Sequence, residues 1–423
     1  MKAEAQMEAG VVSGARPETG IDGRVLAAVA VAALGYFVDM FDLVLFNIVR
    51  VPSLQALGIT SPEMIASMGK RLLDLQLAGM VAGGFFFGAL GDRQGRIRTL
   101  YGSILLYSAA NLGNAFVGGV ASYQALRFLA GFGLAGELGA GVTLVSELLP
   151  TRWRGLGTTA VATTGILGAV AAGIAGETLS WRAFYLCGGV LGALLLVARL
   201  GVGESGIFER SRGAAVSRGN PLLLLWPPRR LARFAAVVLA GMPIWFAASV
   251  LFVFAPEIGR ALGLKETVVP SRVVLAGYLG VAIGNLLAGL VSQLLQSRTR
   301  TIVLFLALLQ AAMAAFLLLA PGGGVRLYVL IGIVGAATGY WAVFVTTAGE
   351  QFGTNLRATA ATSAPNLVRA TAIPVLSAWF ALRASAGTVP ATFALTAICC
   401  AVGLVAALAL RDTFHRDLDY LES

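Results

Sequence analysis

Charged residues, histidine and cysteine are all scarce in this chain. Only 12% of its 423 residues are charged, whereas an average soluble domain has about 25%, so an ordinary soluble globular protein is excluded. The one histidine is His415, and the three cysteines, Cys187, Cys399 and Cys400, lie in hydrophobic runs. These residues support neither a disulfide framework nor a metal site. The sequence also contains no Walker A loop, and we expect no metal and no cofactor.

Long hydrophobic runs occupy most of the chain instead. Hydrophobic residues make up 57% of it, and its mean hydropathy is +0.82. Apolar stretches close to the ~20 residues that cross a bilayer as a helix recur from end to end. Twelve are predicted, at 25–48, 72–91, 99–118, 123–147, 157–179, 183–202, 231–254, 271–294, 301–320, 326–348, 359–382 and 389–410. The expected fold is an all-α polytopic membrane protein with twelve transmembrane helices.

A long polar interruption at 203–230 separates six predicted spans from six. We therefore expect two six-helix bundles, at 23–202 and 231–411, joined by a central cytoplasmic loop. Polar tails are expected at 1–22 and 412–423. Parallel bundles of this kind place a substrate site between them, near the middle of the membrane.

The net charge of +10 does not indicate a nucleic-acid partner. Lys and Arg gather in short loops on the side that also holds both chain ends, where the positive-inside rule places them. We predict that both termini are cytoplasmic and that the chain lies in the inner (plasma) membrane. Its expected partners are the lipid bilayer, a small-molecule substrate and protons, with no nucleic acid, and the protein is expected to be a monomer.

The two halves of the sequence resemble each other. Residues 146–159 (SELLPTRWRGLGTT) align with 349–362 (GEQFGTNLRATAAT), and Arg96 aligns with Arg298. VPSLQALGI after the first predicted span also resembles APEIGRALGL after the seventh. All three correspondences lie at offsets of 202–205 residues. Their agreement indicates an internal duplication into parallel repeats.

A charged motif, GALGDRQGRIR, connects the second and third predicted spans. Its glycines allow helix ends to approach closely and reverse, its acid can pair with arginines or a helix N-terminus, and its arginines can anchor the cytoplasmic face. The residues are Gly88, Gly91, Asp92, Arg93, Gly95, Arg96 and Arg98.

This motif resembles the signature between the second and third helices of the major facilitator superfamily. RFLAGFGLAGE (127–137) and ELLP (147–150) resemble the patterns of that superfamily's fourth helix. DMFD (39–42) and FGTxxR (352–357) resemble its metabolite:proton symporter group. The resemblance covers all twelve predicted spans. Within it, GFGLAG matches the dinucleotide-binding pattern only in its letters, because it lies mid-span, where small residues favour close helix contacts.

The resemblance implies a gate on the cytoplasmic side. The motif at 88–98 is expected to form a latch between helices that opens during transport. Glu147 with Arg152 or Arg154, and Glu350 with Arg357, are expected to complete this gate. On the residues alone, the motif could consist only of positive-inside anchors, and the two pairs could only set the geometry of helix ends.

Ionisable residues inside the predicted spans are costly, by at least about 2.5–3.5 kcal/mol at the bilayer centre. Asp39 and Asp42 are close together on the first span, and two carboxylates in a low-dielectric setting favour binding of a proton. We predict that one of them carries the proton, with Glu137 assisting. The alternative is a salt bridge that holds the two halves together.

Arg127 and Arg369 are predicted to bind an anionic substrate. The alternative for Arg127 is a structural or proton-relay role, and for Arg369 a structural pair with an acid of the N-terminal half. Pro365 and Pro374 flank Arg369 and are expected to break the helix there. Other polar or amphipathic residues within spans are predicted to line the cavity, although each could be a packing residue instead: Tyr36, Asn47, Trp245, Tyr340, Trp341 and Asn366.

The sequence therefore predicts a secondary active transporter and not an enzyme. Its expected cargo is a small organic solute, a carboxylate or similar metabolite, moved by proton-coupled alternating access. The alternative is a proton-antiport exporter of a drug-like or siderophore-like molecule. The costly acids of the first span disfavour a sensor or scaffold without transport activity.

Overall fold

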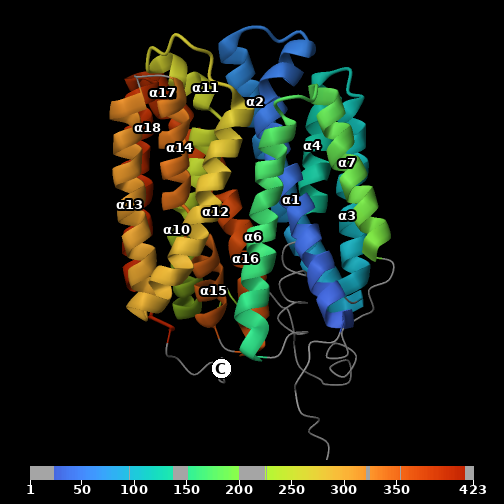
Figure 1. The fold of residues 1–423 in the computed structure, drawn as a ribbon, viewed down its shortest axis with the longest axis vertical. Coiled ribbons are helices and arrows are strands. Elements are labelled where there is room, and N and C mark those ends of the chain that lie inside the picture. The colour runs from blue at the N-terminus through green and yellow to red at the C-terminus, as the bar shows by residue number, and fades with distance from the viewer. Residues whose placement is uncertain are drawn as a thin grey trace, which may run out of the picture.

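A computed structural model describes residues 23–94, 96–136, 151–199, 224, 226–320, 324–352 and 354–414. Helices and turns account for these residues, with no strand in the described part of the chain. The helices stand roughly parallel, those of the first part of the chain on one side and those of the second part on the other (Figure 1). The predicted all-α class is confirmed.

The helices before residue 200 are called the N half. They are α1 (Gly23–Ala56), α2 (Pro62–Gln94), α3 (Arg96–Ala115), α4 (Val120–Leu134), α6 (Thr151–Ala175) and α7 (Trp181–Ala198). The helices after residue 223 are called the C half. They are α10 (Pro228–Phe246), the π-helix η2 (Ala247–Phe252), α11 (Ala255–Ala261), α12 (Pro270–Leu295), α13 (Arg298–Leu319), α14 (Gly324–Ala337), α15 (Trp341–Glu350), α16 (Thr354–Ala370), α17 (Ala372–Ala386) and α18 (Thr388–Ala409).

Every predicted span coincides with helix in the residues that the structure describes, and eight helical segments are long and apolar enough to cross a membrane. The first two helices extend beyond their predicted bounds, because α1 continues to Ala56 and α2 begins at Pro62. Arg50 does not end α1, because its charge is paired. α2 begins at Pro62 because proline is favoured at the first position of a helix. α10 begins at Pro228, inside the segment predicted as a loop.

Large apolar side chains are exposed on the surface of the bundle, among them Phe116, Leu294 and Leu318. Their number and distribution over many helices are typical of a surface that faces lipid instead of water. Buried residues form one extensive core that spans both halves and a second core within the C half.

The helices of the C half are interrupted at three places. Span seven changes into the π-helix η2 after Pro243, span ten breaks between α14 and α15, and span eleven breaks at Thr371, between α16 and α17. The expectation for span eleven was partly wrong, because Pro365 lies inside α16 without a break. The break falls at Thr371 because Pro374 has no N–H to bond the carbonyl four residues earlier, that of Ala370.

Close helix contacts through glycine repeat in the two halves. A Cβ built on Gly79 or Gly83 of α2 would lie 2.2 or 2.0 Å from a carbonyl oxygen of α4, and one on Gly280 or Gly284 of α12 would lie 2.0 or 2.1 Å from one of α14. Only glycine permits such approach. Gly131 of α4, from the GFGLAG segment, lies equally close to α2. The structure thus confirms the helix-contact reading of that segment, and the offset of 201 residues between the two glycine pairs reproduces the sequence repeat.

The bundle has two ends, which we name from Figure 1. The proximal end is the lower one, where the described chain reaches residue 414, and the distal end is the upper one, where α1 turns into α2. The halves pack against each other mainly through α6 with α12 and α2 with α16. The candidate site lies between them.

Candidate substrate and proton site

Arg369 of α16 and Asp39 of α1 meet between the two halves. Arg369 Nη2 lies 3.9 Å from Asp39 Oδ2, and the side chains are 1% and 0% exposed. The sequence left open whether Arg369 binds a substrate or pairs with an acid of the N half, and the structure shows the pair. The guanidinium nitrogens make no hydrogen bond to any described residue. Their donors are therefore unfilled, although the charge is balanced.

Aromatic side chains surround this ion pair. The Arg369 guanidinium carbon lies 5.5 Å from the centroid of the Trp245 ring, within cation–π range. Trp245 lies 6.5 Å from Trp341, edge to face. Tyr36 lies near Trp341, Arg369 and Asp39. A flat apolar group bound beside Arg369 would meet these rings.

A small cavity lies between the halves next to Trp245. In this structure it is well below the size of a small-molecule site, so a substrate needs the halves to move apart. It is lined by residues of α1, α2, span seven and α12: Leu43, Asn47, Leu73, Gln76, Leu77, Trp245, Ala248, Ser249, Val253 and Tyr278. Two predicted site residues, Asn47 and Trp245, are among them. The π-helix supplies Ala248 and Ser249, and π-helical turns frequently occur at functional sites.

Asp42 lies in a different environment from Asp39. A Cβ built on Gly188 of α7 would lie only 2.3 Å from Asp42 Oδ1, so the carboxylate fits against the backbone of α7 because that residue is glycine. Asp42 is 3% exposed. Asp39 therefore faces Arg369 of the C half, whereas Asp42 lies against α7 within the N half.

Arg127 of α4 is built into the N half. Its Nη2 donates to Gln76 Oε1, its guanidinium lies 4.7 Å from the centroid of Phe46, and it is 1% exposed. It also lies within electrostatic range of Asp42. Among the alternatives left by the sequence, this setting favours a structural or proton-relay role over contact with a substrate.

The remaining predicted substrate residues differ in position. Tyr340 donates to the Ala240 carbonyl at 2.9 Å and belongs to the core of the C half, so it is a packing residue. Asn366 of α16 faces α2, because a Cβ on Gly84 would lie 3.6 Å from its Nδ2. Glu137 lies outside the described residues.

Among the described residues, three ion pairs join the halves at the distal end, and none of their residues was predicted from the sequence to belong to a gate. Arg50 of α1 donates to both carboxylate oxygens of Glu257 of α11, at 2.9 and 3.0 Å, with side-chain exposures of 0% and 3%. Arg50 also donates to the Val253 carbonyl at 2.8 Å, and its guanidinium lies 4.5 Å from the centroid of the Phe254 ring.

The other two pairs are more exposed. Arg383 of α17 donates to Glu63 of α2 at 2.9 Å. Glu177, which follows α6, accepts from Ser271 and Arg272 of α12 at 2.6 and 3.2 Å. Each pair crosses from the N half to the C half, so the distal end is closed in this structure.

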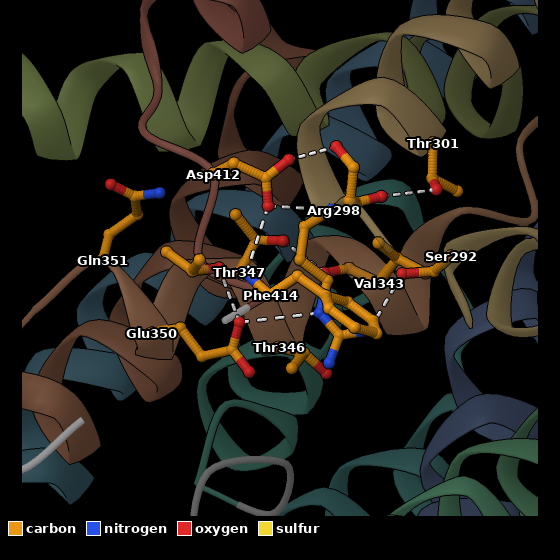
Figure 2. Close-up of polar contacts among 12 residues, drawn as sticks. Ser292, Arg298, Thr301, Val343, Thr346, Thr347, Glu350, Gln351, Asp412 and Phe414 are labelled. Carbon is orange, nitrogen blue, oxygen red and sulfur yellow. Dashed lines mark hydrogen bonds and ion pairs between the residues drawn. The ribbon is translucent and has the colours of Figure 1, made fainter. Parts of the chain in front are cut away.

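At the proximal end, Glu350 is the predicted gate acid whose side chain the structure describes. It lies 3.6 Å from Arg298 Nε and accepts a hydrogen bond from Thr413 at 2.6 Å (Figure 2). Arg298 also donates to Ser292 at 2.9 Å, and its guanidinium lies 5.0 Å from the Phe414 ring centroid. Arg298 is the repeat counterpart of Arg96. Residues that follow α18 thus take part in the contacts of Glu350.

Asp412 lies at the start of α13. It accepts from the Ser297 hydroxyl and, at 3.2 Å, from the Arg298 N–H (Figure 2), at the N-terminus of α13, where a carboxylate is stabilised by the helix dipole. Burial acts to raise the pKa of Asp412, but hydrogen bonds from Ser297 and from backbone N–H groups outweigh burial, so the pKa lies below its ordinary value of 3.8.

The remaining gate residues cannot be placed side chain by side chain. α2 ends at Gln94 and α3 begins at Arg96, so the charged motif lies where one helix passes into the next, as expected. Gly95 and Glu147 lie outside the described residues, as do the side chains of the others: Gly88, Gly91, Asp92, Arg93, Arg96, Arg98, Arg152, Arg154 and Arg357. The pairs of Glu147 with Arg152 or Arg154 and of Glu350 with Arg357 stay predictions.

The repeat in the sequence could have identified the Arg50–Glu257 pair. The repeat alignment already places VPS (51–53) opposite APE (255–257), which makes Glu257 the counterpart of Ser53 and Phe254 the counterpart of Arg50. An arginine and an acid at equivalent helix ends of two repeats can meet across the axis between them. Gln76 had no such signal, because a lone amide in a span is more often a packing residue.

The fold and site define a polytopic helical membrane protein built from two repeats, with a buried ion pair between them. The Major Facilitator Superfamily profile matches residues 32–364. The chain belongs to the Major Facilitator Superfamily, as its motifs predicted, and it is a multi-pass membrane protein.

Relatives and a solved structure support this assignment. The chain is 28% identical to the 3-(3-hydroxy-phenyl)propionate transporter of Escherichia coli over 67% of this chain and 70% of that protein. It is 31% identical to a 4-hydroxybenzoate transporter of Pseudomonas aeruginosa over 38% of each chain, so it spans about two fifths of that relative's length. A D-xylose-proton symporter shares the fold, with a TM-score of 0.72 at 17% identity over 93% of this chain and 99% of the symporter.

Proposed function

We propose that this protein imports an aromatic carboxylate together with a proton. The observation that carries the proposal is the buried Asp39–Arg369 pair between the halves. The pair neutralises Arg369 while leaving its hydrogen-bond donors unfilled. A substrate carboxylate is the ligand that such a guanidinium binds best, through two parallel hydrogen bonds.

Coupling follows from competition for Arg369. While Asp39 is ionised, its carboxylate balances the arginine, and an anionic substrate gains little by displacing it. When Asp39 binds a proton, the guanidinium becomes an uncompensated buried charge, which costs several kcal/mol until an anion replaces the lost partner. Binding of the substrate carboxylate and binding of the proton therefore favour each other, and reciprocity between linked sites is a thermodynamic requirement.

The aromatic surroundings support the substrate class. Trp245 lies beside Arg369, contacts Trp341 edge to face and lines the cavity. A carboxylate attached to a ring would place its charge on Arg369 and its ring among these side chains, where offset or edge-to-face contacts are favourable. The relatives named above transport a hydroxybenzoate and a hydroxyphenylpropionate, which share this combination of ring and carboxylate.

The direction of transport rests on the orientation predicted by the positive-inside rule. With both termini cytoplasmic, the distal end faces the outside and the proximal end faces the cytoplasm. The distal ion pairs then close the outer side, and their opening admits substrate and proton.

Calorimetry on the purified protein tests the coupling. 4-Hydroxybenzoate is titrated at pH 7 in buffers of different ionisation enthalpy, which reports the protons taken up on binding. We expect about one proton taken up per carboxylate bound, and none in Asp39→Asn. Release of a proton on binding would support the alternative, a proton-antiport exporter. Binding without any proton exchange would contradict coupling through Asp39.

A further inference from the structure

Four side chains with an amide or a hydroxyl group line the cavity between the halves: Asn47, Gln76, Ser249 and Tyr278. Two of them are already hydrogen-bonded within the protein. Gln76 accepts from Arg127, and Ser249 donates to the Trp245 carbonyl at 2.5 Å. The side chains of Asn47 and Tyr278 make no hydrogen bond with any described residue, so they are available to a ligand.

Both of these side chains are buried. Asn47 is 7% exposed and Tyr278 is 5% exposed, and the Tyr278 ring packs against Phe252 with 5.7 Å between the ring centroids. Buried polar groups in native proteins are as a rule hydrogen-bonded. Two that are not, on the wall of one cavity, indicate a place for a polar group of the substrate.

The two residues come from different halves of the molecule. Asn47 belongs to α1 of the N half and Tyr278 to α12 of the C half, and these two helices are in contact. Trp245, whose ring centroid lies 5.5 Å from the Arg369 guanidinium carbon, lines the same cavity. A substrate ring beside Trp245 therefore lies between the guanidinium that binds its carboxylate and a wall that carries Asn47 and Tyr278.

The spacing along α1 sets the distance from the ion pair to Asn47. Asp39, Leu43 and Asn47 follow at four-residue steps, which place them on one face of the helix. Asp39 meets Arg369, whereas Leu43 and Asn47 line the cavity. Eight residues of helix measure about 12 Å along the axis. One aromatic ring with a polar group at each end fills this distance once a hydrogen bond of about 2.8 Å is added at both ends.

We propose that Asn47 and Tyr278 bind a hydroxyl group on the ring of the substrate, at the end opposite its carboxylate. This proposal rests on the function proposed above and narrows the substrate class to para-hydroxylated aromatic carboxylates. A phenolic hydroxyl both donates and accepts, and so do an amide side chain and a tyrosine hydroxyl. One substrate hydroxyl can therefore donate to one of the two residues and accept from the other. Because these residues belong to different halves, the bound hydroxyl joins the halves.

Such a site selects by hydrogen bonding and not by size. A ligand of the same shape that lacks the hydroxyl leaves both protein groups unpaired when it binds, and sites built to bond a hydroxyl reject such analogues strongly. 4-Methylbenzoate is the matched probe, because it keeps the ring and the carboxylate of 4-hydroxybenzoate and replaces the hydroxyl by a methyl group of similar size.

Calorimetric titration of the purified protein with these two ligands at pH 7 tests the assignment. Wild type should bind 4-hydroxybenzoate at least tenfold more tightly than 4-methylbenzoate. Asn47→Leu and Tyr278→Phe keep the approximate size of each side chain, and each should reduce this ratio at least threefold by weakening the binding of 4-hydroxybenzoate alone. Tyr328→Phe is the control, since it removes a hydroxyl of the C half that accepts from the Val269 N–H at 3.1 Å, and it should leave the ratio unchanged.

The comparison between the two ligands separates recognition of the hydroxyl from damage to the fold. A variant that weakens both ligands equally, or neither, overturns the assignment of that residue. If Asn47→Leu does not fold, Asn47→Ala takes its place. Equal affinity of wild type for the two ligands overturns the hydroxyl site while the proposed function stands. A wild-type protein that binds neither ligand contradicts the proposed function itself, so the two failures are distinguishable.

Discussion

Arg50 and Glu257 form a bidentate ion pair that joins the two halves of the molecule at their distal end. The two residues lie 207 positions apart and come from equivalent ends of the two repeats. Neither side chain is appreciably exposed, and among the described residues the two charges are balanced by each other, with the Val253 carbonyl and Phe254 ring beside Arg50. The repeat therefore creates the gate, because the same helix end carries the cation in one half and the anion in the other.

Breaking this pair should open the distal end. Removing one partner of a buried ion pair costs about 3–5 kcal/mol. If the arginine reaches water when the halves separate, this cost destabilises the closed state and not the open state. Glu257→Gln should therefore increase access to the cavity from the distal side at least tenfold. The readout is the rate at which a membrane-impermeant thiol reagent labels Ser249→Cys, in a background where Cys187, Cys399 and Cys400 are alanine.

Glu177→Gln is the matched control for that experiment. It removes the acid of another pair that crosses the halves, but Arg272 in that pair is 56% exposed, and exposed pairs contribute about 0–1 kcal/mol. Its labelling rate should stay within about threefold of the parent. If Glu257→Gln and Glu177→Gln label at the same rate, the buried pair is not the main closure of the distal end.

Replacement of Arg369 should remove the carboxylate site. Arg369→Ala should raise the Kd for 4-hydroxybenzoate at least tenfold, which corresponds to about 1.4 kcal/mol. Arg369→Lys should not restore affinity, because an ammonium group cannot form the two parallel hydrogen bonds of a guanidinium. Calorimetric titration of each purified variant measures the Kd, and the amide 4-hydroxybenzamide serves as the uncharged control. Unchanged affinity for the acid in Arg369→Ala contradicts the assignment.

The space beside Asp42 should be sensitive to a single methyl group. In Gly188→Ala the new Cβ would lie 2.3 Å from Asp42 Oδ1, so the carboxylate must move away from α7. We expect proton-driven uptake to fall at least tenfold while exchange of labelled for unlabelled 4-hydroxybenzoate persists. Gly102→Ala is the control, since its Cβ would meet only the Phe87 ring at 3.7 Å, an ordinary contact. Equal uptake in the two variants would show that the position of Asp42 is not critical.

The contacts of Asp412 predict a dependence of stability on pH. Its pKa is lowered in the folded protein below the ordinary value of 3.8. The ionised carboxylate therefore stabilises the fold fully above about pH 4, and this stabilisation is lost as the pH falls through the lowered pKa. Asp412→Asn removes most of it.

Thermal unfolding of the purified protein between pH 3 and pH 7 measures this effect. At pH 7, Asp412→Asn should unfold at a slightly lower temperature than wild type, since a carboxylate at a helix N-terminus is worth about 0.3–1 kcal/mol. The difference should shrink as the pH falls below 4. A difference that stays constant over the whole range would mean that the ionised carboxylate is not the stabilising form.

Much of the fold could be predicted from the sequence because the bilayer imposes strong rules. The length of the apolar stretches predicted the positions of the spans, and the motif at 88–98 indicated where α2 passes into α3. Helix ends were less predictable, since α1 carries Arg50 beyond its apolar stretch and the break in span eleven falls at Thr371 instead of at Pro365. Such details depend on which charges are paired and which carbonyls are left without a donor, and these are tertiary properties.

The site was predictable in its residue types but not in its pairings. The cost of charge in a membrane singled out Asp39, Asp42, Arg127 and Arg369 from the sequence alone. It could not show that Asp39 faces the C half while Asp42 faces α7, because three residues along a helix change the direction of a side chain by about 60°. Nor could it identify Arg50 and Glu257 as partners, since both lie at predicted span ends, where single charges are common.

The central claim is that entry of an aromatic carboxylate and entry of a proton are one event. The direct measurement is uptake of labelled 4-hydroxybenzoate into proteoliposomes of the purified protein, with a pH-sensitive dye inside to record protons. We expect accumulation only with an inward proton gradient, accompanied by acidification of the interior beyond that of protein-free liposomes, and neither in Asp39→Asn. Accumulation driven by the opposite gradient, or uptake that ignores the gradient, would contradict the account.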